Sequence, residues 1–131
     1  MPCCARCAEG ATVIKTIAFL KRKAGLSQAQ FIEYYETRHA PLILSIAPQV
    51  CDYRRNFLVP EGAILAPGAP PPDFDVVTEL WYADAAAFAA AMAAFTDPVN
   101  AARIAADEEN VFDRAFTRFF TVDERRSPQR P

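Results

Sequence analysis

The order in which strand-like and helix-like segments follow one another restricts the fold of this chain more than any other feature. Four segments rich in β-branched and aromatic residues predict strands, at 12–21, 51–59, 75–82 and 116–122. One helix is predicted between the first two strands, and a helical stretch between the last two. This β-α-β-β-α-β order predicts an α+β, ferredoxin-like fold with a four-stranded antiparallel sheet.

The first helix is delimited by a capping pattern and a proline. Ser27, followed three residues later by Gln30, predicts the start of the helix. We expect it to run to about His39, because Pro41 lacks a backbone N–H and should break or kink it. Residues 42–47 are expected to add a short helical turn.

The second helical stretch has two start signals. Asp84 is an expected N-cap, and the apolar stripe that follows includes Phe88, Met92 and Phe95. The Asp97-Pro98 pair predicts a second start, because aspartate caps helices and proline suits the first helical position.

The expected domain organisation is one domain with two flanking segments. Residues 1–11 are interpreted as an N-terminal extension, 12–122 as the domain and 123–131 as a disordered C-terminal tail. Segment 60–73 contains five prolines and two glycines, so it cannot be a regular element and should form an excursion between two strands.

Composition argues against several classes of protein. The net charge of −2 comes without a basic stripe, which argues against nucleic-acid binding. The apolar run at 85–95 is too short to span a bilayer, and the N-terminus does not resemble a secretory signal. We therefore expect a soluble, cytoplasmic protein with neither a nucleic-acid nor a membrane partner.

The four cysteines do not form a convincing metal site. Cys3, Cys4 and Cys7 crowd together and include a C-x-x-C, but a structural zinc site needs a second ligand pair, and Cys51 stands alone in a predicted strand. We expect the N-terminal cysteines to be reduced thiols in an extension outside the domain.

The single histidine is the main candidate for chemistry. Phe31, Tyr35 and His39 are spaced i, i+4, i+8, which places them on one helix face turned toward the interior. An imidazole titrates near neutral pH and can act as a general base or acid, with Tyr35 orienting it or donating to a developing enolate oxygen. The alternative is a core histidine with satisfied hydrogen bonds.

Strand residues are candidates for substrate binding. Tyr53 and Trp81 either wall a pocket or are plain core or interface aromatics. Of the adjacent Arg54 and Arg55 one must face inward or into an interface, and an inward Arg55 would bind a carboxylate or phenolate.

Acidic residues near the last strand are weaker candidates. Asp113 either pairs with His39 or is a solvated turn residue, and the run 107–109 is expected to be a solvated face. No phosphate loop, dinucleotide fingerprint, nucleophile elbow or metal-ligand spacing is present, so we expect no cofactor and no metal. Proton transfer, positioning and desolvation are the remaining means of catalysis.

The strand pattern also predicts an assembly. In the predicted strand at 12–21, Ile17 and Phe19 point to the face opposite Ala18 and Leu20, and the later predicted strands likewise carry apolar residues on both faces. Helices can cover only one face, so we expect a two-fold symmetric homodimer through the other.

Residues of the first helix resemble a known family. Lys21–Ser27, Phe31, Tyr34-Tyr35 and Arg38–Leu42 resemble the opening of EthD-domain proteins, which belong to the dimeric α+β barrel superfamily. Less specific similarity continues through Glu79–Tyr82 and Phe119–Glu124, so the resemblance covers residues 12–122.

This resemblance implies a homodimer with facing sheets and a pocket between sheet and helices in each subunit. The family and its relatives include polyketide cyclases, dehydratases, cofactor-free quinone-forming monooxygenases, muconolactone isomerases and accessory proteins, one linked to ether-degrading cytochrome P450 systems. The long segment 60–73 departs from the family pattern, so substrate size does not carry over if it covers the pocket mouth.

The resulting hypothesis is a cofactor-independent lyase, isomerase or cyclase. It would act by general acid–base catalysis on a small hydrophobic, aromatic or polyketide-like molecule. Two alternatives remain, a cofactor-free monooxygenase of anthrone-like aromatics and a non-catalytic accessory or ligand-binding dimer.

Overall fold

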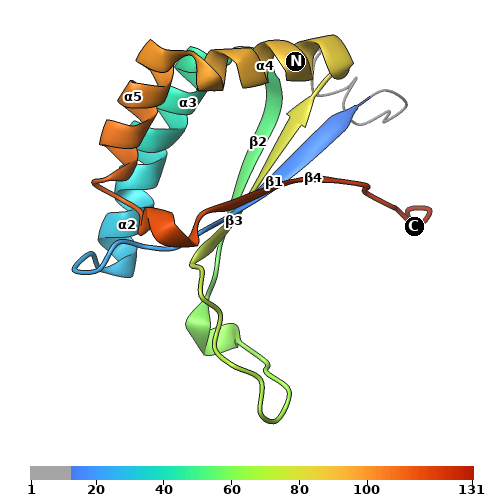
Figure 1. The fold of residues 1–131 in the computed structure, drawn as a ribbon. Helices are drawn as coiled ribbons and strands as arrows, with labels where there is room; N and C mark the ends of the chain where they lie inside the picture. Colours follow the sequence, from blue (N-terminus) through green and yellow to red (C-terminus); the bar gives the residue numbers. More distant parts are fainter. Residues whose placement is uncertain (1–12) are drawn as a thin grey trace.

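The computed structural model of the chain describes residues 13–131 (Figure 1). The predicted extension at 1–11, with Cys3, Cys4 and Cys7, lies outside the described residues. The regular elements occur in the order β1, α2, η1, α3, β2, η2, β3, α4, α5, η3, β4. This order confirms the predicted α+β, ferredoxin-like plan.

The sheet has four strands in the spatial order β2-β3-β1-β4, and each neighbouring pair is antiparallel. The strand bounds are β1 Ile14–Leu20, β2 Val50–Phe57, β3 Val76–Tyr82 and β4 Arg118–Val122. All four predicted strands are present, with ends shifted by one or two residues. A 3₁₀ turn, η3 (Arg114–Phe116), occupies the first residue of the predicted last strand.

Helices cover one face of this sheet, as Figure 1 shows. One continuous helical rod consists of α2 (Gln28–Tyr34), the π-helical turn η1 (Tyr35–His39) and α3 (Ala40–Ile46). The second stretch consists of α4 (Ala85–Thr96) and α5 (Pro98–Glu108).

A break or a kink was predicted at Pro41; the helix does not break there, and the expected helical continuation through residues 42–46 is present. In a regular α-helix the proline ring collides with the carbonyl one turn earlier. Here the π-turn widens the spiral, and the Ala40 N–H donates to the Tyr35 carbonyl, five residues back. The π-turn therefore lets the chain pass Pro41 and places His39 at its end.

The helix start signals are confirmed. Ser27 and Gln30 form a complete capping box, with the Gln30 N–H donating to Ser27 Oγ at 3.1 Å. Asp84 and Asp97 accept from backbone N–H groups of α4 and α5 and cap both helices. A cap of this kind contributes about 1 kcal/mol.

The two faces of the sheet differ in their surroundings. Ala18, Thr78 and Leu80 point toward the helices and are buried. Among residues 13–131 no helix lies over the opposite face; there Ile17 pairs with Phe120, and Phe120 is 48% exposed. The prediction of apolar residues on both faces is therefore confirmed.

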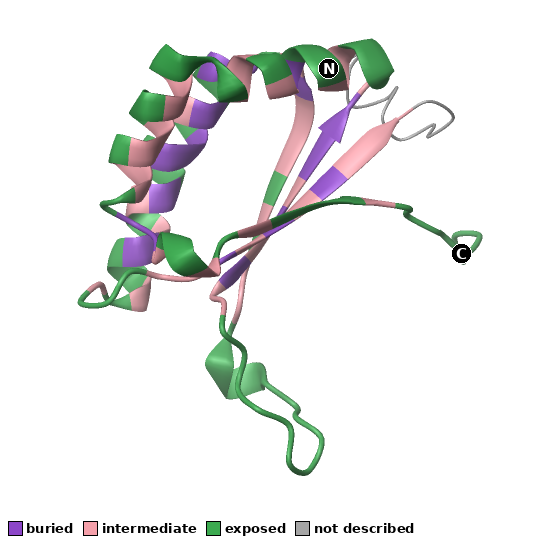
Figure 2. Ribbon diagram, in the orientation of Figure 1, coloured by how far each residue is buried: buried purple, intermediate pink, exposed green. Residues whose placement is uncertain are grey.

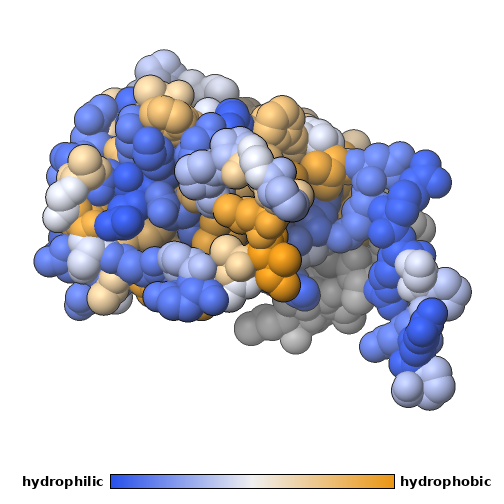
Figure 3. All heavy atoms as spheres, turned by 90° about the horizontal axis from the view of Figure 1, so that it is seen from below, coloured by the Kyte–Doolittle hydropathy of each residue, from blue (hydrophilic) through white to orange (hydrophobic). Residues whose placement is uncertain are grey.

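Segment 60–73 projects from the body as an excursion between β2 and β3 (Figure 2). Apart from a single 3₁₀ turn, η2 (Pro60–Gly62), it has no regular structure, and Ile64 in it is 96% exposed. Figure 3, which views the molecule from this side, shows hydrophobic side chains in the middle of that surface. The predicted irregular excursion is confirmed.

The C-terminal segment 123–131 has no helix or strand and is exposed. Its start is nevertheless attached to the sheet, because Lys15 Nζ lies 2.6 Å from Glu124 Oε2. Cys51 in β2 is disulfide-bonded, which the sequence analysis did not anticipate. Within residues 13–131 no helix is both long and apolar enough to cross a membrane.

Candidate functional site

A cavity of about 360 Å³ lies between the inner face of the sheet and the helices. Most of its wall is apolar, contributed by Ala18, Leu20, Ile43, Leu80, Met92, Phe95, Ala101, Ile104 and Phe119. Its polar lining consists of Tyr35, His39, Tyr53, Thr78, Glu108, Arg114 and Thr117. The size and composition are those of a small-molecule site.

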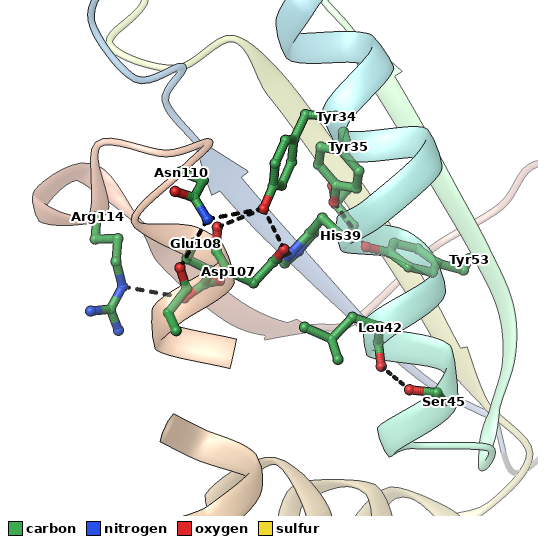
Figure 4. A network of polar contacts seen from close by, with 12 residues as sticks. Tyr34, Tyr35, His39, Leu42, Ser45, Tyr53, Asp107, Glu108, Asn110 and Arg114 are labelled. Carbon is green, nitrogen blue, oxygen red and sulfur yellow. Dashed lines mark hydrogen bonds and ion pairs between the residues drawn. The ribbon is translucent and has the colours of Figure 1, made fainter. Parts of the chain in front are cut away.

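His39 stands at the end of the π-turn with its ring on the cavity wall and only 3% exposed. Its Nδ1 lies 2.7 Å from Oδ2 of Asp107, in the last turn of α5 (Figure 4). Burial lowers the pKa of His39 below its ordinary value, while Asp107 acts in the opposite direction. The imidazole is therefore neutral at neutral pH and can accept a proton.

The contact with Asp107 also fixes the tautomer of His39. A carboxylate accepts hydrogen bonds, so Nδ1 carries the proton and donates it to Asp107. Nε2 is then the basic nitrogen, and within residues 13–131 it has no hydrogen-bond partner. The arrangement leaves one lone pair of the ring available to a molecule in the cavity.

Asp107 is itself held by a second hydrogen bond. The Tyr34 hydroxyl donates to Asp107 Oδ1 at 2.9 Å, and Asn110 Nδ2 donates to the Tyr34 oxygen at 3.2 Å (Figure 4). The Asp107 side chain is 12% exposed. The prediction that 107–109 form a solvated face is therefore wrong for this residue.

A cluster of three hydroxyl groups occupies another part of the wall. The Tyr35 oxygen lies 2.6 Å from Thr78 Oγ1 and 3.0 Å from the Tyr53 oxygen. Burial raises the pKa of Tyr35 to about 12 and that of Tyr53 well above its ordinary value. Both phenols are therefore neutral hydrogen-bond donors at neutral pH.

An acidic and a basic side chain lie near each other on the wall. Glu108 Oε1 is 3.3 Å from Nε of Arg114, and the Arg114 side chain is 45% exposed. Burial, together with the charges of Asp107 and Glu109, raises the pKa of Glu108, although Arg114 opposes the change. Glu108 therefore holds a proton to higher pH than an ordinary glutamate.

The structure brings together some of the predicted site residues. Phe31, Tyr35 and His39 do share one helix face, with the Tyr35 and His39 ring centroids 4.9 Å apart. Tyr53 lines the cavity as expected. Phe31 is 1% exposed and does not line the cavity; it packs beneath the site against Tyr35.

Three other predicted residues lie away from the cavity. Trp81 is on the opposite face of the sheet, between the Lys15 ammonium at 4.5 Å and the Arg54 guanidinium at 4.8 Å. Arg55 is engaged by Glu36 through two hydrogen bonds.

Asp113 is not the partner of His39. It precedes η3, and its backbone N–H donates to the Lys21 carbonyl. Asp107, six residues earlier in the chain, takes the role that the sequence analysis considered for Asp113.

Sequence reasoning missed Asp107, Thr78, Glu108 and Arg114. A signal for Glu108 existed, because Ala101, Ile104 and Glu108 are spaced i, i+3, i+7 and share the cavity side of α5. No comparable spacing singled out Arg114.

Residues 13–131 contain no cluster of three histidine, cysteine, aspartate or glutamate side chains that could hold a metal ion.

A family model, the EthD domain, matches residues 23–115. The match includes the rod that carries His39 and the segment that carries Asp107. No curated protein matches the chain.

Solved structures share the fold. A protein of the EthD (ethyl tert-butyl ether) family from Bacillus halodurans matches with a TM-score of 0.58 and 22% identity, over 87% of this chain and 100% of that one. SnoaB from Streptomyces nogalater, a cofactor-independent oxygenase, matches with a TM-score of 0.57 and 14% identity over 91% and 100%. Hydroxynitrile lyase from Passiflora edulis matches with a TM-score of 0.52 and 20% identity over 88% and 98%.

Two further matching structures, from Bacteroides fragilis and Thermobifida fusca, are described as dimeric and ferredoxin-like. The fold of this chain is accordingly that of the dimeric α+β barrel proteins.

Proposed function

The chain belongs to the EthD domain family, and from that premise we propose that it is a cofactor-independent lyase, isomerase or cyclase. Its substrate is a small hydrophobic molecule, aromatic or polyketide-like, and its chemistry is general acid–base catalysis. The single observation that carries the proposal is the His39–Asp107 pair on the wall of an apolar cavity.

The base is His39 Nε2. It takes a proton from a carbon next to a carbonyl; the C–H electrons form the C=C bond of an enolate, and the carbonyl electrons move onto oxygen. Asp107 stabilises the imidazolium that results. Return of the proton to another carbon gives isomerisation, attack of the enolate carbon on a second carbonyl gives cyclisation, and loss of a leaving group gives a lyase.

The cavity favours this step in two ways. Its mostly apolar wall lowers the local polarity, which strengthens the interactions made by the few polar groups inside. Its volume of about 360 Å³ suits a small ring system rather than a polymer.

The named activities of two structural neighbours agree with chemistry of this kind. One is called a hydroxynitrile lyase and the other a cofactor-independent oxygenase. The second name keeps an alternative open, in which the carbanion made by the same base reacts with oxygen.

The test uses a reaction that needs no knowledge of the natural substrate. The protein is incubated in D₂O with 2-tetralone, a hydrophobic ketone with comparatively acidic C–H bonds, and loss of the proton signals is followed by NMR. We expect exchange above the buffer rate in the wild-type protein and none above it in His39→Gln. Equal exchange in both proteins contradicts the proposal.

Two further measurements separate the alternatives. Oxygen consumption with anthrone, dependent on His39, supports the monooxygenase. Binding of 2-tetralone with neither exchange nor oxygen consumption supports an accessory or ligand-binding protein.

The partner of this chain is a second copy, joined through the uncovered sheet face. Phe120 is 48% exposed there and lies opposite Ile17. Light scattering of the wild-type protein should give the mass of a dimer, and Phe120→Glu should give that of a monomer. Ile64→Glu, on the projecting segment, is the control and should remain a dimer; a dimeric Phe120→Glu contradicts this interface.

A further inference from the structure

The three hydroxyl groups of Tyr35, Tyr53 and Thr78 carry one proton more than their mutual hydrogen bonds use. Two hydrogen bonds join the three groups. Each hydroxyl has one proton to donate. One proton is therefore left over. It belongs either to the end group that does not donate inward or, if both ends donate to Tyr35, to Tyr35 itself.

Burial decides which group that is. Tyr35, in the middle, is 0% exposed, and Thr78 is 2% exposed. If the donation ran from Tyr53 to Tyr35 to Thr78, the leftover proton would sit on Thr78. Thr78 also borders the cavity but is almost fully buried, and among residues 13–131 its only hydrogen-bond partner is Tyr35. If both ends donated to Tyr35, the leftover proton would sit on that fully buried phenol. An unsatisfied buried donor is costly, so both arrangements are disfavoured.

The opposite direction has no such cost. Thr78 donates to Tyr35, Tyr35 donates to Tyr53, and the Tyr53 proton is left facing the cavity that Tyr53 lines. Tyr53 is only partly buried, so water or a ligand can accept from it. A hydroxyl that accepts one hydrogen bond is also a better donor of the next.

We propose that Tyr53 is the hydrogen-bond donor to the substrate's oxygen, and that the cavity selects ligands with a carbonyl oxygen at this position. Tyr35 and Thr78 are positioning residues that polarise Tyr53. This role rests on the proposed function, because proton removal by His39 is what turns the substrate's carbonyl into an enolate. The enolate oxygen carries more negative charge than the carbonyl oxygen, and the Tyr53 hydroxyl stabilises it. The substrate class is therefore a hydrophobic ketone or a related enolisable carbonyl compound.

The test compares two probes of the same size, 2-tetralone, which has a carbonyl group, and tetralin, which lacks it. Replacing Tyr53→Phe should raise the Kd of 2-tetralone about three- to tenfold and leave the Kd of tetralin unchanged, because only the ketone loses a hydrogen bond. The infrared carbonyl band of bound, ¹³C-labelled 2-tetralone should lie at lower frequency in the wild-type protein than in Tyr53→Phe. Tyr82→Phe is the matched control, since Tyr82 is buried against Thr16 outside the cavity, and it should change neither quantity.

Several results overturn the assignment. One is an unchanged Kd and carbonyl frequency of 2-tetralone in Tyr53→Phe. Another is weaker binding of 2-tetralone in Thr78→Val but not in Tyr53→Phe. A third is failure of the wild-type protein to bind either probe. The deuterium-exchange assay keeps the two proposals separate. If His39→Gln exchanges normally while Tyr53→Phe shifts the carbonyl band, the proposed function fails and the role of Tyr53 remains. If His39→Gln abolishes exchange while Tyr53→Phe leaves the carbonyl band unchanged, the role of His39 as base remains and the role of Tyr53 as donor fails.

Discussion

Two of the polar regions on the cavity wall differ in what they can do with a proton. At the first, His39 is held by a carboxylate and keeps a free lone pair on Nε2. At the second, Tyr35, Tyr53 and Thr78 are linked only to one another, and burial raises the pKa of both phenols. The first region can take up a proton, whereas the second can only donate hydrogen bonds.

This difference shows how one buried cavity can hold a proton acceptor and hydrogen-bond donors in separate places. Burial acts against the charged form in both regions. At His39 the hydrogen bond and charge of Asp107 oppose that effect, whereas at the two phenols the charge of Arg55 opposes it without a hydrogen bond to either hydroxyl. A substrate between the two regions would lose a proton to one and have its oxygen stabilised by the other.

The largest expected effect comes from removing the base. His39→Gln should lower the exchange rate of 2-tetralone by about 10²- to 10⁴-fold, the usual contribution of a general base. Tyr35→Phe, on the other region, should lower it far less. The exchange rates are measured by NMR in D₂O. A comparable fall in the rate in both variants would contradict the assignment of different roles to the two regions.

Asp107→Asn should have the next largest effect. The amide can donate to Nδ1 and so stabilise the wrong tautomer, and it cannot stabilise the imidazolium. We expect the exchange rate to fall by about 10²-fold or more. Asp113→Asn is the matched control, because Asp113 does not contact His39; equal losses in both would contradict the pairing.

The two regions also differ in how far the sequence predicts them. The i, i+4, i+8 spacing correctly placed Phe31, Tyr35 and His39 on one face, because local helix geometry fixes that relation. The Asp107 contact joins residues 68 positions apart. This contact depends on how α5 packs against the helical rod, and no pattern within a short stretch of sequence predicts that packing.

The same limit applies to Trp81 and Pro41. Alternation along β3 places Trp81 opposite Leu80, but which face the helices cover is a tertiary property. Proline was expected on local grounds to break or kink the helix, and a π-turn instead carries the helix past it without a break. Strand order and helix caps were predictable because each depends on a short stretch of chain.

A pH dependence of stability would sharpen the description of the first region. The pKa of His39 is lowered in the folded protein, so as pH falls the unfolded chain binds a proton near 6.5, before the folded one does. The contribution of neutral His39 to the free energy of unfolding is therefore fully present above about pH 6.5. It decreases as the pH falls from there to the pKa of His39 in the folded protein. Urea unfolding from pH 7.5 to 5 should show a steeper loss in the wild-type protein than in His39→Gln, and identical slopes would contradict the burial argument.

The smallest effect is expected from Tyr35→Phe, which tests the second region without touching the base. The variant keeps the ring that packs against His39 and Phe112 but removes the hydroxyl between Thr78 and Tyr53. Loss of these hydrogen bonds should lower the free energy of unfolding by about 0.5–1.5 kcal/mol. Because the variant leaves the His39–Asp107 pair intact, the pH profile of exchange should keep its midpoint even where the rate falls. A shifted midpoint would mean that the two regions are electrostatically coupled, and that the division between a proton-accepting and a hydrogen-bond-donating side does not hold.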